Sequence, residues 1–269
     1  MSLEHITKDT TLNGSFAAKP SNMGTRFHNY LYETLDLPYV YKAFSPVDIQ
    51  GAVQAIRALP MRGAAVSMPF KEQVIDFIDQ LNPSAQAISS VNTIVNDAGK
   101  LTGYNTDYTA VKNLLEQKLI PATGKELSVI IQGSGGMAKA VTAAFKDTGF
   151  KNVTIVARNQ ATGSQLASEY GYEYSSLQSI ADVLVNVTPQ GMNGELSFQE
   201  DFVQLAQFIF DVVAFPAETP LIKLAQHLDK PYISGDEVHT MQSVEQFVLY
   251  TGKRPSDELI HQARKYAVQ

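Results

Sequence analysis

The chain has 269 residues, of which 44% are hydrophobic and 18% are charged, and its net charge at pH 7 is −6. These values are typical of a globular protein with a buried core, organised as one large domain or two of ordinary size, and they exclude extensive disorder. The chain contains no cysteine, which excludes disulfides, thiolate metal sites and a cysteine nucleophile.

Charge and hydropathy also bear on the class of partner. The net charge is negative and Lys and Arg are not clustered, so we expect no nucleic acid partner, because phosphate binding needs concentrated positive charge. No apolar stretch approaches the roughly 18 residues of a membrane span. Residues 1–10 lack the basic-then-apolar order of a signal peptide. We therefore expect a cytoplasmic protein that does not bind membranes; monomer and homodimer both remain open.

From about residue 38 to residue 110, short apolar runs alternate with amphipathic segments. Apolar residues three to four apart predict helices, and short apolar runs bounded by turn residues predict strands. Pro69 precedes the second helix and is a helix-entry signal. We predict strands at 39–44, 64–68, 89–96 and 100–105, and helices at 47–59 and 71–81.

A predicted helix at 106–117 and a turn-rich linker at 120–126 lead into a regular alternation of strands and helices. The strands here are continuous apolar runs, which are typical of a parallel sheet buried on both faces. The chain ends in helical segments from 238 to 267, interrupted at 251–256. We predict strands at 126–132, 152–158, 183–188 and 208–214, and helices at 136–148 and 161–170.

A glycine-rich turn lies between the first strand and the first helix of this alternation. Gly133, Gly135 and Gly136 follow the strand, and Met137 and Ala138 begin the helix. Glycine permits the tight turn and lets a diphosphate approach the N–H groups at the helix N-terminus. A purely structural turn would explain the glycines alone, but the strand–turn–helix context favours a dinucleotide. We predict binding of a dinucleotide cofactor here.

The end of the following strand indicates which nucleotide binds. An acidic side chain there accepts hydrogen bonds from the ribose 2′-OH in NAD sites, whereas an Arg accommodates the 2′-phosphate of NADP. The sequence offers Arg158 and no carboxylate. An ordinary solvated Arg is the alternative explanation. The pattern favours NADP.

Candidates for proton transfer come from the first half of the chain. Hydride transfer to a carbonyl leaves an oxygen that must receive a proton. Lys71 and Asp107 both follow predicted strands, where open α/β sheets bind their ligands. Asp107 also fits a helix N-cap, and His28 and His239 are explained by packing or exposure. We predict that Lys71 and Asp107 form a catalytic pair.

Seven segments in order along the chain contain characteristic Lys, Asn, Asp, Gly and Gln residues. They are AVSMPFK (65–71), SVNTIV (90–95), GYNTD (103–107), GSGGMAKA (133–140), NVTPQGM (186–192), DVVAFPAETPLI (211–222) and MQSVEQFVLYTG (241–252). In these segments and their order, the chain resembles the shikimate dehydrogenase family along nearly its full length.

The resemblance implies an N-terminal α/β substrate and catalytic domain (1–110), a Rossmann-type NADP-binding domain (111–237) and C-terminal helices (238–269) that pack back on the first. It implies a reversible NADP-linked reduction of 3-dehydroshikimate to shikimate, or of a close cyclic analogue. Lys71 and Asp107 match the family's catalytic pair. Asn92 and Gln242 match its contacts to ring hydroxyls, and Thr188 lies in a segment that matches its cofactor domain.

Some positions depart from the family pattern. A Ser-x-Ser pair that holds the substrate carboxylate is replaced by Asn22 and Gly24, and a Tyr is replaced by Ala214. Ser67 stands at the family's Thr, and Ser67 and Asn22 remain candidate substrate contacts. Each lost hydroxyl removes a charge-assisted hydrogen bond of about 1.5–3 kcal/mol. We expect weak activity on shikimate.

Two other functions remain open. The first is a quinate/shikimate dehydrogenase or an enzyme that reduces an amino-substituted analogue. The second is a non-catalytic regulator that binds NADP, although retention of Lys71 and Asp107 argues against it. No compact cluster of His, Asp and Glu indicates a metal site.

Overall fold

A computed structural model describes residues 6–269. Residues 1–5 lie outside the described part. They belong to the stretch 1–10 that lacks the pattern of a signal peptide. Contacts divide the chain into two compact units: unit 1 comprises Met1–Thr106 and Thr240–Gln269, and unit 2 comprises Asp107–His239. Within the described part, no helix combines the length and the apolar character needed to cross a membrane.

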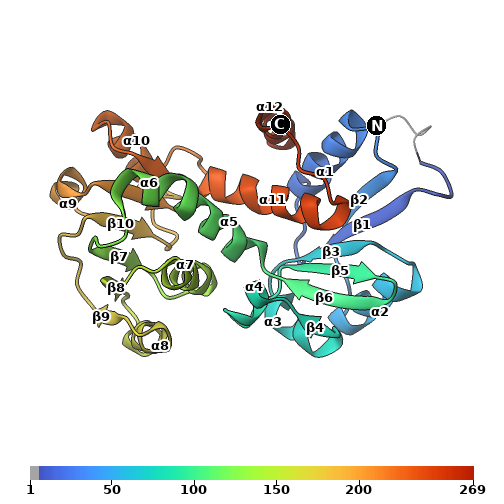
Figure 1. Cartoon of the computed structure of the whole chain (residues 1–269), viewed down its shortest axis with the longest axis horizontal. Coiled ribbons are helices and arrows are strands. Elements are labelled where there is room, and N and C mark those ends of the chain that lie inside the picture. Colours follow the sequence, from blue (N-terminus) through green and yellow to red (C-terminus); the bar gives the residue numbers. More distant parts are fainter. Residues whose placement is uncertain (1–5) are drawn as a thin grey trace. The chain divides into compact units, whose positions relative to one another are not determined.

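Unit 1 contains a mixed six-stranded sheet with the order β2-β1-β3-β5-β6-β4 (Figure 1). β1 pairs with β2 and β3 in parallel, β5 runs antiparallel to both β3 and β6, and β4 pairs with β6 in parallel. The strands are β1 (Thr11–Phe16), β2 (Tyr39–Phe44), β3 (Gly63–Val66), β4 (Gln80–Leu81), β5 (Thr93–Asp97) and β6 (Lys100–Tyr104).

The predicted strand at 39–44 is confirmed, but β1 is absent from the predictions. Its residues Asn13 and Gly14 have the composition of a turn. They form a strand because β1 lies between β2 and β3 and hydrogen-bonds to both. The buried Asn13 side chain donates from Nδ2 to the Tyr32 hydroxyl (2.9 Å), which gives its amide N–H₂ group a partner inside the sheet.

The predicted helix at 71–81 is wrong. The segment forms α3 (Phe70–Gln73), a 3₁₀ turn (Val74–Phe77) and then β4. Asp79 ends the helical part because its N–H donates to Leu101 O (3.0 Å) and its carboxylate accepts from Leu101 N (2.6 Å). Pairing with β6 thus replaces the last helical turns.

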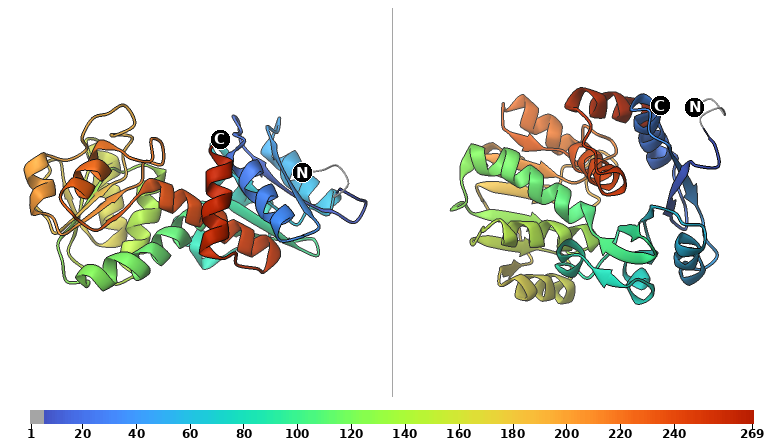
Figure 2. Two further views of the ribbon diagram at one scale, coloured as in Figure 1. Left: turned by 90° about the horizontal axis from the view of Figure 1, so that it is seen from above. Right: turned by 45° about the vertical axis from the view of Figure 1, so that its right-hand side comes forward.

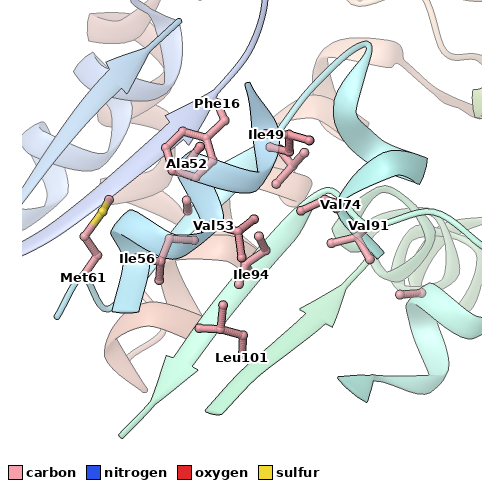
Figure 3. Close-up of a cluster of buried hydrophobic side chains, with 13 residues drawn as sticks. Phe16, Ile49, Ala52, Val53, Ile56, Met61, Val74, Val91, Ile94 and Leu101 are labelled. Carbon is pink, nitrogen blue, oxygen red and sulfur yellow. The ribbon is translucent and has the colours of Figure 1, made fainter. Parts of the chain in front are cut away.

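One face of this sheet is covered by α2 (Ile49–Ala58). Asp48 is the N-cap residue of this helix, and its side chain accepts a hydrogen bond from Gly51 N. Val53 and Ile56 of α2 are fully buried and pack with Ile94 of β5 and Leu101 of β6 (Figure 3). Burial of aliphatic side chains of this size contributes about 1.5–3 kcal/mol each.

A second hydrophobic core in unit 1 packs the N-terminal helix α1 against the C-terminal helices α11 and α12. Leu31 and Tyr32 of α1 (Met23–Thr34) pack with Phe247 of α11 (Gly235–Thr251) and Ala263 of α12 (Asp257–Ala267). Figure 2 shows α1 in blue beside α12 in dark red. The predicted return of the C-terminal helices to the first domain is confirmed.

Unit 2 contains a parallel sheet with the order β12-β11-β10-β7-β8-β9. This is the doubly wound order of a Rossmann fold, as predicted. Val203 of α9 and Leu221 of α10 pack on the sheet. The elements are β7 (Val129–Gln132), α7 (Gly136–Asp147), β8 (Val153–Val156), α8 (Gln160–Tyr170), β9 (Glu173–Ser175), β10 (Val183–Asn186), α9 (Glu200–Leu205), β11 (Phe208–Asp211), α10 (Pro220–His227) and β12 (Tyr232–Ile233).

The predicted linker at 120–126 is partly helical. α5 (Thr106–Leu114) continues through a π-helical turn (Leu115–Leu119) into α6 (Ile120–Thr123). The helix ends at Gly124, whose φ of 80° suits glycine. Pro121 lies just after the π-helical turn, where the regular i→i−4 hydrogen-bond pattern is already interrupted, so its missing N–H does not break the helix.

His28 of α1 is fully buried among aromatic rings. Its ring stacks on that of Tyr41 at 4.5 Å between centroids, with Phe247 at 6.3 Å. Burial lowers the pKa of His28 from 6.5 to about 3. The unfolded chain therefore binds a proton below pH 6.5 that the folded chain does not, so stability is lost as pH falls from 6.5 towards 3.

We predict that His28→Phe removes this pH dependence. Between about pH 6 and pH 4, the free energy of unfolding of the wild type should fall by about 1.4 kcal/mol per pH unit relative to the variant. Urea titrations followed by circular dichroism measure both curves, and the other titrating groups cancel in the difference. Parallel curves would show that His28 is not neutral and buried in the folded protein.

Candidate active site

The antiparallel strands of unit 1 bring three segments to one edge of its sheet. β3 ends at this edge, β5 begins there, and β6 ends there, because β5 is antiparallel to both neighbours. The residues that follow β3, precede β5 and follow β6 are therefore neighbours. They include Lys71, Asn92 and Thr106.

Lys71 lies in α3, immediately after the turn through Pro69. Phe70 N donates to Ser67 O (2.9 Å), and Lys71 O accepts from Val91 N (2.8 Å). The backbone of Lys71 is thus fixed to the residue next to Asn92. The proline turn ends β3 and places the partly exposed lysine at the sheet edge.

Asn92 is 1% exposed, and its side chain has a defined orientation. Its Oδ1 accepts from Thr106 N (2.8 Å), Thr106 Oγ1 (3.1 Å) and Thr93 Oγ1 (2.9 Å). Its Nδ2 has no hydrogen-bond partner among the described residues. Since buried amide groups are nearly always satisfied, this N–H₂ group suits a ligand with an acceptor oxygen.

The turn that leads to Asp107 is held by buried hydrogen bonds. Asn105 N donates to Ser84 Oγ (3.0 Å) of α4 (Pro83–Gln86), and Asn105 Nδ2 donates to Ser90 O (2.9 Å). Asp107 follows Thr106 in the first turn of α5, where the helix dipole favours a carboxylate. The first segment of unit 1 ends at Thr106, and unit 2 begins at Asp107.

Asn22 and Gly24 follow β1, which ends at the same edge as the parallel strand β3. Asn22 precedes α1 but makes no capping bond with its side chain, and it is exposed, as is Ser67. A Cβ added at Gly24 would lie 3.5 Å from the Tyr41 hydroxyl, an ordinary contact. A larger residue therefore fits at position 24.

Gln242 lies on α11, in the part of that helix that belongs to unit 1. One turn later Gln246 is 4% exposed, and its Nε2 donates to Thr93 Oγ1 (3.1 Å). Gln246 does not appear among the predicted site residues. The repeat of Gln at positions 242 and 246, which share a helix face, is the signal that sequence reasoning could have used.

The glycine-rich turn of unit 2 connects β7 to α7. At Gly133, φ is 128°, and an added Cβ would lie 2.9 Å from Val187 Cγ2, so a side chain is excluded. At Gly135 and Gly136, an added Cβ would meet no described atom within 4 Å. The N-terminus of α7 is thus open, with no acidic residue in its first turn and no side-chain cap.

This open helix N-terminus fits the diphosphate of a dinucleotide, because it offers N–H donors and the positive end of the helix dipole. The structure does not give each predicted cofactor residue the same surroundings. Met137 is partly exposed, whereas the side chain of Ala138 is buried in unit 2. Any contact of Ala138 with a phosphate would therefore use its backbone.

Arg158 follows β8 and is exposed. The neighbouring Asn159 is the N-cap residue of α8, and its side chain accepts a hydrogen bond from Thr162 N (3.2 Å). Thr162 Oγ1 also lies 2.7 Å from Ser134 Oγ of the glycine-rich turn. These bonds join the ends of β7 and β8, where this fold binds the diphosphate and the adenosine ribose of a dinucleotide.

Thr188 follows β10, in a loop held by buried polar groups. Its N and Oγ1 donate to Asn186 Oδ1 (3.1 and 2.6 Å), and Asn186 Nδ2 donates to Asp211 Oδ1 (2.9 Å). Asp211 also accepts from Thr219 Oγ1 (2.6 Å) and Val213 N (3.1 Å). Burial raises the pKa of Asp211 above its ordinary value. The Thr188 hydroxyl thus orients the loop at the edge where β7 and β10 end.

The helix α5 is attached to unit 2 directly after Asp107. Tyr108 donates from its hydroxyl to Asp147 Oδ2 (2.5 Å) at the end of α7. Burial, followed by the hydrogen bond to this carboxylate, raises the pKa of the Tyr108 hydroxyl. Further along the helical segment, Lys118 forms an ion pair with Glu237 (2.6 Å) of α11.

Comparisons with known proteins match both units. Residues 21–94 match the model of the shikimate dehydrogenase substrate binding domain, and residues 114–188 match that of shikimate / quinate 5-dehydrogenase. The chain is 54% identical to a shikimate dehydrogenase-like protein of Haemophilus influenzae over 97% of this chain and 98% of that protein. It is 33% identical to the shikimate dehydrogenase (NADP(+)) of Pyrococcus furiosus over 87% of each.

Solved structures agree. A shikimate 5-dehydrogenase-like protein superposes with a TM-score of 0.95 at 52% identity, over 98% of this chain and 100% of that chain. The quinate dehydrogenase of Corynebacterium glutamicum in complex with NAD superposes with a TM-score of 0.84 at 25% identity, over 96% and 99%. With identity of this level along almost the whole chain, the protein belongs to the shikimate dehydrogenase family of oxidoreductases.

Proposed function

We propose that this protein catalyses reversible hydride transfer between NADPH and a cyclic keto acid of the 3-dehydroshikimate type. The observation that carries the proposal is the arrangement at the sheet edge of unit 1. Asn92 presents a buried amide donor to a ligand. The backbone next to it holds Lys71, which can donate a proton.

Unit 2 is proposed to bind NADP, as the named function of the Pyrococcus relative suggests. Gly133, Gly135, Gly136 and the N–H groups of Met137 and Ala138 would hold the diphosphate. Arg158 would pair with the 2′-phosphate, and the loop of Thr188 would border the site where β7 and β10 end. When bound, the nicotinamide supplies or accepts the hydride.

Proton transfer is assigned to unit 1 and to the residue that follows it. In the reduction direction, the carbonyl oxygen becomes a hydroxyl and takes a proton from the Lys71 ammonium. In the oxidation direction, the neutral Lys71 amine removes that proton from the hydroxyl. The Asp107 carboxylate would orient the ammonium. Asn92 and Gln242 would donate to ring oxygens.

The carboxylate end of the substrate is proposed to meet Asn22 and Ser67. Both side chains are exposed and free of capping bonds in the described structure. Gly24 offers no side-chain donor. Since each missing charge-assisted bond is worth about 1.5–3 kcal/mol, we propose weak turnover of shikimate.

Quinate is a second candidate substrate, because the matching family model names both acids. A relative that superposes over almost the whole chain is a quinate dehydrogenase bound to NAD. Arg158, with no carboxylate at the adjacent positions, favours NADP over NAD here. Initial rates with shikimate and quinate, each with NADP and NAD, rank the four combinations.

We predict that Lys71→Ala lowers kcat for the preferred acid by about 10²–10⁴-fold, which is the usual contribution of a positioned general acid or base. NADP binding, measured by fluorescence titration, should stay within about twofold because the residue lies in unit 1. Lys100→Ala, an exposed lysine of β6, is the matched control and should retain wild-type rates. Normal turnover by Lys71→Ala would refute the assignment.

We predict that Arg158→Ala weakens NADP binding by about 10- to 150-fold, the equivalent of one charge-assisted contact. NAD lacks the 2′-phosphate, so its dissociation constant should change by less than about twofold. Titrating one variant with both nucleotides gives an internal control. An equal loss for both would assign Arg158 to folding of the turn rather than to the phosphate.

We predict that Gly24→Ser lowers KM for shikimate by roughly tenfold, since one hydroxyl bond to a carboxylate contributes about 1.5 kcal/mol or more. The space beside Tyr41 accepts the added Cβ. Gly24→Ala adds the same Cβ without the hydroxyl and should leave KM near the wild-type value. If serine and alanine behave alike, position 24 does not contact the carboxylate.

A further inference from the structure

We infer that Gln246 is a positioning residue that fixes the amide of Asn92 through the hydroxyl of Thr93. The inference rests on the proposed function in that it takes Asn92 and Gln242 as substrate contacts. Gln246, Thr93 and Asn92 are 4%, 0% and 1% exposed. They form a continuous buried chain from α11 to the start of β5.

The direction of each hydrogen bond follows from the chemistry of its groups. Gln246 Nε2 is a donor only, so Thr93 Oγ1 accepts at 3.1 Å. The single hydroxyl hydrogen of Thr93 then goes to Asn92 Oδ1 at 2.9 Å, in preference to Thr106 Oγ1 at 3.5 Å. When the hydrogen bonds of a chain all run in the same direction, each bond polarises the next, and every bond in the chain becomes stronger.

Asn92 Oδ1 thereby receives three donors, from Thr93 Oγ1, Thr106 Oγ1 and Thr106 N. A flipped amide would place N–H₂ against Thr106 N–H, which cannot accept a hydrogen bond. The amide group of Asn92 must therefore face the ligand with Nδ2. The ligand atom at this point needs a lone pair, as a hydroxyl oxygen has and an ammonium group lacks.

Gln246 also fixes the second proposed donor. Gln242 lies four residues earlier on the same face of α11. The bond between Gln246 and Thr93 is buried and joins residues 153 positions apart in the sequence. Val244 and Phe247 of the same helix are fully buried as well. One contact thus connects the residue after Asn92, at the start of β5, to the helix α11 that carries Gln242.

Four variants separate positioning from packing. Gln246→Leu keeps the volume but removes the donor, and Thr93→Val removes the hydroxyl. Thr93→Ser retains the hydroxyl and should rescue the effect. Val244→Ala is the matched control, since it creates a cavity beside the same helix and lowers stability through lost packing alone.

We expect Gln246→Leu and Thr93→Val each to raise KM for the acid that the wild type oxidises faster, shikimate or quinate, by roughly three- to tenfold. The double variant should show no more than the larger single effect, because the two bonds act in series. The dissociation constant of NADP should not change. Thr93→Ser should stay within twofold of wild type, and Val244→Ala should lower the melting temperature without raising KM.

A readout without turnover completes the test. In ¹⁵N-labelled protein, the side-chain amide resonances of Asn92 are identified by their loss in Asn92→Ala. We expect Gln246→Leu to shift them and Val244→Ala to leave them in place. Unmoved resonances in Gln246→Leu, or an equal rise in KM in Val244→Ala, would overturn the inference. If the wild type oxidises neither acid, the proposed function fails, and these resonances still decide the role of Gln246.

Discussion

The direction of the strands is the constraint on which both candidate sites depend. In unit 2, every strand of the sheet runs parallel, so the residues after β7, β8 and β10 lie along one edge. In unit 1, the reversal of β5 brings its first residues to the edge where β3 and β6 end. Loops at such edges carry side chains without disturbing the core, and for this reason open α/β sheets bind ligands there.

Both edges are held by buried polar side chains rather than by apolar packing alone. Asn92 in unit 1 and Asp211 in unit 2 each accept three hydrogen bonds. Burial of these acceptor oxygens would cost several kcal/mol without their donors. When the partners are present, each loop has a single favourable conformation. Fixing of the donors in advance reduces the entropy lost when a ligand binds.

Residue patterns predicted the elements whose stability is local. The strand at β2, the helix α7 and the glycine-rich turn all follow from apolar spacing or from a dihedral requirement such as that of Gly133. The predictions failed where distant contacts decide. β1 contains turn-like residues and forms through its two neighbours, and the segment after Phe77 is not helical because it pairs with β6. Gln246 was missed because its partner Thr93 is far away in sequence.

The passage of the chain from one unit to the other has a consequence for chemistry. Thr106 is bonded to Asn92 in unit 1, and Tyr108 is bonded to Asp147 in unit 2, so the residue between them has anchored neighbours on both sides. These two anchors limit the backbone torsions of Asp107 before any ligand binds. The direction of the carboxylate proposed for proton transfer is thus set by its two neighbours in the sequence, so that a substitution at Thr106 or Tyr108 would reach the chemistry without touching Asp107.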